Sequence, residues 1–522
     1  MRVFMFWVNL FAATWGLARD LYVAPGGVNN PPYDSWLNAA TQIEWAVNAG
    51  ANGDSVWISN GVYVLTNQIT VSNNLTISGT GGGVVVDGNN TTRCFYFNSV
   101  TGSLAHLFIT RGNSTQHGGG VYAYMSKITV QDCVFSNNQS AGVGSYYGGG
   151  LSVYLSPSSV VQRCAFVENS AGTYGGGVAI VGTTAVVRVD HCTFYANVAD
   201  LGGGLYGQSA MNTITGCDFI CNVATGTTGC GGGCYHLGIL TTSTLTSNVA
   251  MRAGGGVFGG SVMSNCAVVD NIAGVENYAN ANGGGADTGA LVRNCVFARN
   301  RLIGTAGNTG GGGIFPRTGA RIYDCIIDEN SSTQYGGGLW IKNSNVEIRN
   351  CLIRNNVTVG SYHGGGVAVW FAPPGNVTIS SCTIVSNYSC TQGGGLYVGG
   401  NQFGVPLVEN SILYFNGAVG VNSNYMFNIS PATVFTNCCL SPALPIGITN
   451  VNTLTNSPQF IDLLAGDYRL TRASPCVNSG VIRSWMADAN DLDGRARLDR
   501  FSGLVDVGCY EYLPVGMFIN AR

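Results

Sequence analysis

Residues 192–206 read CTFYANVADLGGGLY, and the first part of this pattern occurs eleven times along the chain. Each copy has Cys or Ser at its first position, an apolar residue two places later and Asn five places after the first. Glycine triplets, each followed by an apolar residue, recur with the same regularity. Successive copies begin 23 to 31 residues apart, and a repeat of that length is typical of a solenoid.

Three sets of equivalent positions define the repeat. The first position is occupied by Cys133, Cys164, Cys192, Cys217, Ser243, Cys266, Cys295, Cys325, Cys351, Cys382 and Ser411. The asparagines are Asn138, Asn169, Asn197, Asn222, Asn248, Asn271, Asn300, Asn330, Asn356, Asn387 and Asn416. The triplets begin at Gly118, Gly148, Gly175, Gly202, Gly231, Gly254, Gly283, Gly311, Gly336, Gly364 and Gly393.

The repeat predicts short β-strands. Small and apolar positions alternate with variable ones at a period of two, as in Cys192 and Phe194 against Thr193 and Tyr195. Glycines would weaken the interior of a helix by about 1 kcal/mol each. A single coil is too small to bury its own apolar face, so coils must stack about 4.8 Å apart, with equivalent residues in ladders.

Each ladder has an expected place in the coil. Cys and the apolar residue face inward. Asn lies at a corner, where its amide can hydrogen-bond the turn and the amides of neighbouring coils, and where Asn tolerates the left-handed conformation. The glycine triplet marks a second corner, where side chains would clash or φ is positive. Extra residues between corners loop out, so the spacing varies while the core of the repeat does not.

The paired GGG-apolar and F-x-x-N motifs resemble the repeats of chlamydial-type polymorphic outer membrane proteins, over residues 100 to 420. More broadly the chain resembles exported bacterial right-handed parallel β-helix proteins. The resemblance implies an all-β, right-handed parallel β-helix. A helical apolar stripe between Trp36 and Ala49 predicts an N-terminal capping helix, because an open solenoid end exposes strand edges and core.

The end of the chain has motifs of its own. Residues 436–522 contain SPQFID, GDYRL, ASPCVNSG, DLDGRAR and VDVGCYEY. These motifs resemble the choice-of-anchor module that follows β-helices in exported bacterial proteins. We therefore expect a signal peptide at 1–18, a cap and first coils at 19–100, β-helix repeats at 101–435 and a small β module at 436–522.

The N-terminus and the composition indicate the compartment. Met1 and Arg2 precede an apolar run ending at Ala18, which is typical of a secretory signal peptide. No later stretch is apolar enough to span a bilayer as a helix. Only 9% of residues are charged and the formal net charge is −3, which argues against a nucleic-acid partner. We expect a bacterial protein that is extracellular or attached to the cell surface; its oligomeric state is not indicated.

The chain has 18 cysteines, nine of them at the first position of the repeat. We expect these nine to form a reduced, buried ladder of small apolar side chains. Among the others, Cys476 and Cys509 are the best candidates for a disulfide in an exported protein.

Aromatic residues follow many of the glycine triplets and are expected on the outward face, where consecutive coils would align them in a stripe. Such rings suit stacking on sugars of a polysaccharide or cell-surface glycan, or contact with a partner. The alternatives are a ladder that only stabilises the sheet, or one covered by loops. The residues are Tyr122, Tyr124, Tyr154, Tyr206, Tyr235, Phe258, Phe315, Trp340, Trp370 and Tyr397.

Polysaccharide lyases and inverting hydrolases occur on related folds, so their chemistry is an alternative function. A lyase needs carboxylates for calcium and an Arg or Lys base, whereas a hydrolase needs paired carboxylates. The closest approaches are Asp190 with His191, and Asp324 with Asp328 and Glu329. We favour a salt-bridged ladder for charges such as Asp270 and Arg299, and find no catalytic motif.

The tail contains an acidic loop, Asp488, Asn490, Asp491, Asp493 and Gly494, that resembles part of a calcium loop but lacks the distal glutamate. A tight Asx-rich turn is the favoured interpretation, and calcium is the single candidate cofactor. The sequence thus favours binding, by adhesion or carbohydrate recognition, over polysaccharide cleavage or a structural role at the cell surface.

Overall fold

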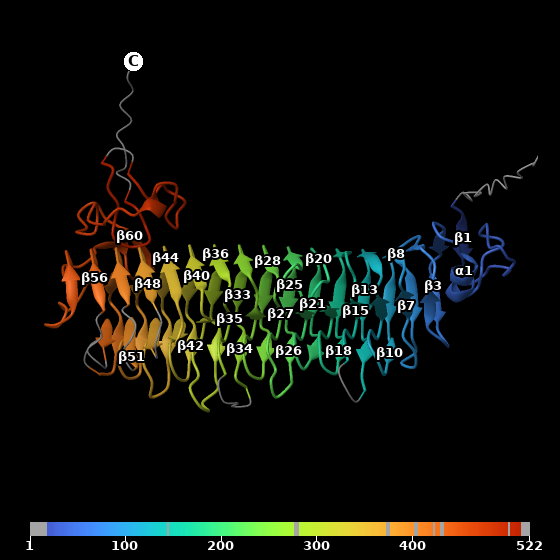
Figure 1. Ribbon diagram of the computed structural model, residues 1–522, viewed down its shortest axis with the longest axis horizontal. Helices are drawn as coiled ribbons and strands as arrows, with labels where there is room; N and C mark the ends of the chain where they lie inside the picture. The colour runs from blue at the N-terminus through green and yellow to red at the C-terminus, as the bar shows by residue number, and fades with distance from the viewer. Residues whose placement is uncertain are drawn as a thin grey trace, which may run out of the picture.

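The computed structural model describes residues 18–142, 146–275, 281–371, 376–400, 406–420, 423–427, 433–499 and 502–512. They form a long solenoid of parallel strands with a small module near each end of the chain (Figure 1). The predicted signal peptide, apart from Ala18, lies outside the described residues. Among the described residues there is no helix long and apolar enough to cross a membrane.

One coil shows how the repeat is built. β23 (Leu205–Gly207), β24 (Thr213–Thr215), β25 (Asp218–Ile220) and β26 (Val223–Ala224) follow one another around the coil. The chain then enters β27 (Cys234–His236), which pairs in parallel with β23, so that Leu205 lies beside Cys234. Strands of the same place in successive coils therefore form continuous parallel sheets.

The solenoid has four such sheets within the described part of the chain. Sheet A has 17 strands, from β1 (Asp20–Val23) to β58 (Thr449–Val451). Sheet B has 15, from β3 (Gly61–Val64) to β57 (Cys439–Leu440), and sheet C has 14, from β4 (Ile69–Val71) to β55 (Tyr425–Phe427). Sheet D has 12, from β10 (Asn113–Ser114) to β54 (Gly417–Ala418).

The asparagine ladder lies inside the corner between sheets B and D. Asn222 is fully buried, and its Nδ2 donates to the Phe194 carbonyl at 2.9 Å and to Asn248 Oδ1 at 3.0 Å. Its own Oδ1 accepts from the backbone N and Nδ2 of Asn197, both at 3.0 Å. Each amide thus bridges neighbouring coils, as the sequence predicts.

The left-handed residue at this corner is the one before each Asn, not the Asn itself. Asp270, Arg299 and Glu329 have φ of 58°, 53° and 53°. The preceding residue faces outward and makes the turn, which leaves the Asn side chain inside. At the next corner the first glycine of each triplet has positive φ, and a Cβ on Gly203 would lie 2.5 Å from the Val223 carbonyl oxygen. Only glycine fits there.

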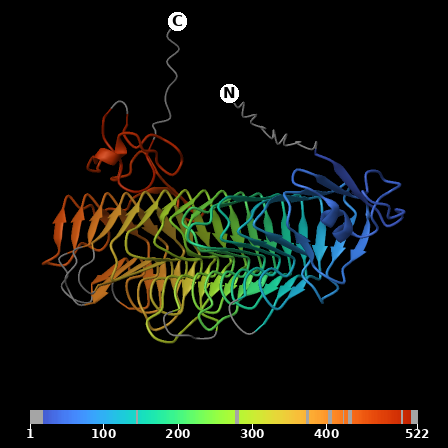
Figure 2. The same cartoon turned by 45° about the vertical axis from the view of Figure 1, so that its right-hand side comes forward.

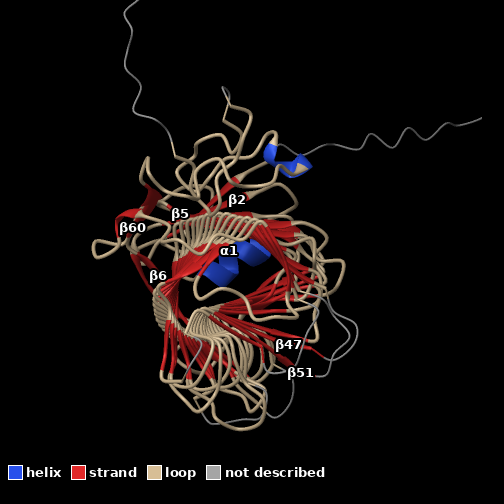
Figure 3. Ribbon diagram, turned by 90° about the vertical axis from the view of Figure 1, so that its left-hand side faces the viewer, coloured by secondary structure: helices blue, strands red, loops and turns tan. Residues whose placement is uncertain are grey.

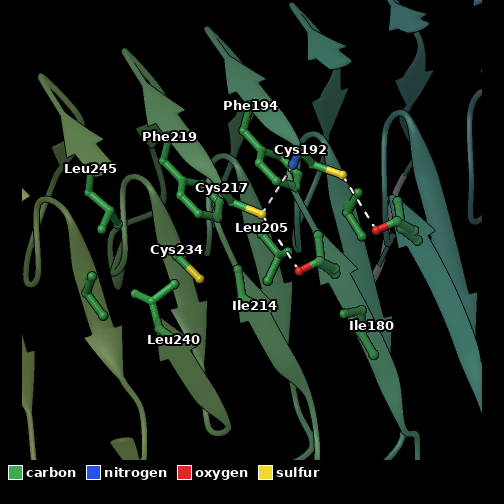
Figure 4. Close-up of a cluster of buried hydrophobic side chains, with 14 of the residues drawn as sticks. Ile180, Cys192, Phe194, Leu205, Ile214, Cys217, Phe219, Cys234, Leu240 and Leu245 are labelled. Atoms are coloured by element: carbon green, nitrogen blue, oxygen red, sulfur yellow. Dashed lines mark hydrogen bonds between the residues drawn. The ribbon is translucent and has the colours of Figure 1, made fainter. Parts of the chain in front are cut away.

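The cysteine ladder is buried at the corner between sheets A and B and contributes to the main core (Figure 4). The backbone N of Cys192 donates to Cys217 Sγ at 3.4 Å, and Cys192 Sγ donates to the Asp190 carbonyl at 3.4 Å. All nine ladder cysteines are free thiols, as predicted. Phe194 and Phe219 stack beside them with centroids 4.6 Å apart.

The N-terminal end of the core is covered by α1 (Ile43–Ala49), which buries Ile43, Ala46 and Val47 in the same cluster (Figure 3). The capping helix is thus confirmed, but it is shorter than the stripe from Trp36 suggested. Ala40 forms a β-bridge with Val23 instead, and its backbone exchanges hydrogen bonds with the chain around that strand.

The C-terminal module packs on the side of the solenoid (Figures 1 and 2). It contains the antiparallel pair β59 (Phe460–Asp462) and β60 (Asp467–Leu470) and the 3-10 turn η1 (Ser484–Met486). Asn410 Nδ2 donates to the Val481 carbonyl at 2.7 Å, and Arg483 pairs with Glu409 at 2.6 Å. The sheets continue to β58, past the boundary expected at residue 435.

Candidate functional site

A groove with a volume of 770 Å³ lies on the outer face of sheet A near the N-terminal end. It is built on β2 (Ser55–Ile58), β5 (Thr76–Gly79), β8 (Thr101–Ala105) and β12 (Lys127–Gln131). Parallel register places Trp57 beside Ser78 and Thr76 beside Ser103. Its lining is Trp57, Thr76, Ser78, Gly79, Thr80, Ser103, Ala105, His106, Thr129 and Gln131.

Polar neighbours fix the side chains at both sides of this groove. The indole N–H of Trp57 donates to the Asp20 carboxylate at 2.8 Å, which holds the half-buried ring in one orientation. On the other side Gln162 Nε2 donates to Gln131 Oε1 at 2.9 Å, so the amide row continues into the next coil. Among the described residues that line the groove there is no Asp, Glu, Lys or Arg. The surface offers one aromatic face and several neutral hydrogen-bonding groups.

The aromatic stripe predicted from the sequence exists on sheet C, but it is not open. Tyr174 stacks against Tyr206 at 4.4 Å, Tyr206 against Tyr235 at 5.1 Å, and Tyr235 against Phe258 at 4.8 Å. None of the ten predicted residues is exposed. Half-buried are Tyr122, Tyr124, Tyr154, Tyr206, Tyr235, Phe258, Phe315 and Trp370; Trp340 and Tyr397 are fully buried.

Toward its two ends the stripe is flanked by further rings that directly precede glycine triplets, namely His117, Tyr147, Tyr174, Tyr335 and His363. Tyr335 stacks on Trp340 with centroids 5.5 Å apart and also contacts Trp370, while His363 stacks on Tyr397 at 4.3 Å. Burial raises the pKa of Tyr335 to about 12. The rings are therefore half-buried or buried and not fully exposed as expected, which is closer to the covered ladder that the sequence left as an alternative. Ligand binding by these residues stays a prediction.

One acidic residue interrupts the stripe. Asp287 takes the place between Phe258 and Phe315 in the register of sheet C and is 1% exposed. Arg317 Nε donates to its Oδ1 at 2.5 Å, and the guanidinium lies 4.5 Å from the Phe258 ring centroid. Burial raises the pKa of Asp287, and the hydrogen bond from Arg317 opposes that shift. The buried carboxylate and the cation compensate each other.

Of the four carboxylates considered for catalysis, the three aspartates are each held by a partner. Asp190 lies 3.1 Å from Nδ1 of His191. Asp324 accepts from Arg293 Nε at 2.9 Å and from Asn350 at 2.7 Å.

Asp328 and Glu329 lie at the next corner of the same coil, where β41 (Ile326–Asp328) ends. Asp328 accepts from Arg354 at 2.8 Å and from Asn355 at 3.0 Å, and Glu329 is exposed. Arg299 pairs with Asp270 at 2.9 Å, which confirms the salt-bridged ladder for that pair. Such pairing contributes to the stability of the sheets.

The acidic loop of the tail is an Asx-rich turn. Asp491 is 5% exposed, and its Oδ1 accepts from the backbone N–H groups of Asp493 and Arg495 while Oδ2 accepts from Glu511 N. Asp488 and Asn490 line a 470 Å³ groove against the solenoid. Across the described ranges, no three His, Cys, Asp or Glu side chains are grouped as metal ligands. Calcium binding by this loop stays a prediction.

The predicted disulfide between Cys476 and Cys509 is absent, and both are buried free thiols. The reason is that the two side chains pack in different clusters. Cys476 lies with Cys439 and Val507, whereas Cys509 lies with Leu352, Val385 and Tyr468, and its backbone N donates to Thr383.

Sequence reasoning missed the groove on sheet A. The eleven regular copies begin at Cys133, after the strands that carry Trp57, Ser78 and Ser103. The available signal was the alternation of polar and apolar residues in those strands, such as Thr76, Ile77 and Ser78.

Comparison with known protein families supports the fold. A family model described as a right-handed β-helix region matches residues 49–237 and 241–412. A curated relative, the metabotropic glutamate receptor-like protein R of Dictyostelium discoideum, is 29% identical over 96 residues, which cover 18% of this chain and only 6% of that protein.

Solved structures with a similar path of the chain are more distant. Pectate lyase Pel9A is 13% identical with a TM-score of 0.27, over 94% of this chain and 96% of that one. Tailspike protein 3 of bacteriophage CBA120 is 12% identical with a TM-score of 0.31, over 79% and 56%. At these scores neither likeness bears on function. The family match and the parallel sheets confirm the right-handed parallel β-helix predicted from the sequence.

Proposed function

Because the chain belongs to the right-handed β-helix family, in which equivalent residues form straight rows along the molecule, we propose that it binds a linear glycan in the groove on sheet A. The observation that carries this proposal is the 770 Å³ groove itself, with the fixed ring of Trp57 at one side and neutral polar groups along its floor. A repeating ligand suits a surface whose own groups repeat at the spacing of the coils.

The chemistry of the lining favours neutral sugars. A flat indole packs against the apolar face of a sugar ring. Ser, Thr and Gln side chains both donate and accept hydrogen bonds, which matches hydroxyl groups. Rigid strands hold these groups in place, so little conformational entropy is lost on binding. This proposal keeps the glycan-binding role that the sequence suggested, but assigns it to the groove on sheet A and not to the aromatic stripe on sheet C.

The proposed setting is the exterior of a bacterial cell, where such a protein would act in adhesion or carbohydrate recognition. The apolar run before Ala18 supports export. The free, buried cysteine ladder is compatible with that setting, because no ladder thiol is exposed to an oxidant.

The test is affinity electrophoresis of the full chain through gels that contain neutral or acidic polysaccharides. We expect retardation by at least one neutral polymer, and at least a tenfold loss of affinity in Trp57→Ala. Trp45→Ala is the matched control, because Trp45 is an exposed tryptophan on α1 outside the groove. Equal retardation of Trp57→Ala and the parent protein would refute the groove as the site.

The same polymers should be assayed for cleavage, with calcium present. We expect no release of reducing ends or unsaturated uronates, because Asp190, Asp324 and Asp328 are each engaged with a neighbouring side chain. Reproducible release that is lost on substitution of one of these carboxylates would replace binding by cleavage. An absence of both retardation and release across a broad panel would favour a structural role.

A further inference from the structure

A second hollow, of 280 Å³, lies where the chain enters β7 (Phe95–Asn98), the second strand of sheet C. It lies apart from the groove on sheet A, with which it shares no lining residue. The described residues of its lining include one charged side chain and no carboxylate. The residues are Gln68, Thr91, Thr92, Arg93, Asn113, Ser114, Thr115 and Gln116.

The charged residue is Arg93, which is only 7% exposed. Its Nε donates to the carbonyl oxygens of His117 at 3.0 Å and Gly118 at 2.9 Å. Nη1 donates to Gln68 Oε1 at 2.8 Å, and Nη2 donates to Ser114 Oγ at 2.8 Å. Every one of these acceptors is neutral. A guanidinium has five N–H groups, so one on Nη1 and one on Nη2 remain for another acceptor.

Nothing in the described part of the chain neutralises this cation. Arg93 forms no ion pair with an Asp or Glu there, and its other neighbours are the rings of Tyr122, at 5.2 Å, and Tyr96, at 5.7 Å. Arginine keeps its charge even when buried. A buried charge without a counter-ion is strongly destabilising.

Arg317 shows how this fold compensates the same situation elsewhere. It also lies over an aromatic ring of sheet C, that of Phe258, but the buried carboxylate of Asp287 receives its guanidinium. Arg93 has the ring contacts and the neutral acceptors without the carboxylate. The hollow beside it lies where an anion would complete the arrangement.

We propose that this hollow binds an oxyanion, a carboxylate, sulfate or phosphate group, through Arg93. The two remaining N–H groups of the guanidinium would donate to two anion oxygens, and a hydroxyl such as that of Thr115 and the second amide N–H of Asn113 would donate to the others. The group can belong to an acidic saccharide or to a free inorganic anion, since both present the same chemistry. This site does not rest on the groove on sheet A.

The test is thermal unfolding of the full chain with sodium sulfate, sodium phosphate, a uronic-acid oligosaccharide or a neutral oligosaccharide, at ionic strength matched with sodium chloride. We expect a saturable rise in Tm with at least one of the oxyanions and none with sodium chloride. Saturation by the uronic-acid oligosaccharide at lower concentration than by sulfate and phosphate identifies a saccharide site, and the reverse identifies an inorganic anion site.

Variants separate the site from general anion effects. Arg93→Gln should lower the affinity at least about tenfold, because a charge-assisted hydrogen-bond pair is lost. Arg93→Lys keeps the charge and should retain part of the response. Arg317→Gln is the matched control and should respond as the parent protein does, since Asp287 already satisfies Arg317. No saturable response in the parent protein, or an undiminished one in Arg93→Gln, would overturn the proposal.

Discussion

Replacing a single ladder asparagine tests whether the ladder holds the coils together. In Asn222→Ala four hydrogen bonds disappear: two that Asn222 Nδ2 donates, to Phe194 O and Asn248 Oδ1, and two that its Oδ1 accepts from Asn197. The amide is fully buried, so water cannot replace it. Each buried polar group left without a partner costs about 1 to 3 kcal/mol, so we expect a loss of about 4 kcal/mol or more.

The assay is urea unfolding followed by circular dichroism, together with native-state hydrogen exchange, because long repeat arrays lose two-state behaviour. Exchange should accelerate most in β22 (Val198–Ala199), β26 and β30 (Val249–Ala250), the strands next to the missing amide. The control is Cys221→Ala, at the exposed neighbouring position, with an expected change within about 0.5 kcal/mol. A loss below about 1 kcal/mol in Asn222→Ala would refute the role given to the ladder.

Two further predictions concern a buried histidine and the docked tail. Burial lowers the pKa of His236 from 6.5 to about 4, so the unfolded chain binds the proton more tightly than the folded chain does. The free energy of unfolding is therefore highest above pH 6.5 and falls by about 3 kcal/mol as the pH drops to 4. His236→Leu should remove that part of the pH dependence of the urea midpoint, and an unchanged slope would contradict this. Asn410→Ala should speed proteolysis within residues 457–499, because both hydrogen bonds between Asn410 and Val481 are lost. Asn265→Ala, at the equivalent corner away from the tail, should leave the rate of proteolysis unchanged. Equal proteolysis rates in the two variants would argue against docking through Asn410.

The repeat made the solenoid predictable because each of its three positions has one physical task. Each repeat has an amide that bridges coils, a small buried thiol and a corner without a side chain, as at Asn222, Cys217 and Gly203. These positions are found by comparing the repeats of the one chain with each other. The left-handed corners were misplaced by one residue. The position before each Asn varies freely, as Asp270 and Arg299 show, so it left no pattern to read.

The candidate sites were less predictable because they depend on segments outside the repeat. The loops before the glycine triplets differ in length, and sequence alone did not show that rings such as Tyr335 fold over Trp340. Trp57 and Arg93 stand before the first full copy of the repeat. Arg93 in particular is one arginine among many in the sequence; only its burial and its neutral neighbours mark it as a site.

The ladder of free thiols can report which coils open first when the protein unfolds. Nine coils each carry one cysteine at the same place, and each is buried in the native state. An alkylating reagent can reach such a sulfur only when its coil opens. The order in which Cys133, Cys266 and Cys382 become modified during mild denaturation would therefore show whether the solenoid opens from one end, from both ends or from the middle, without any engineered cysteine.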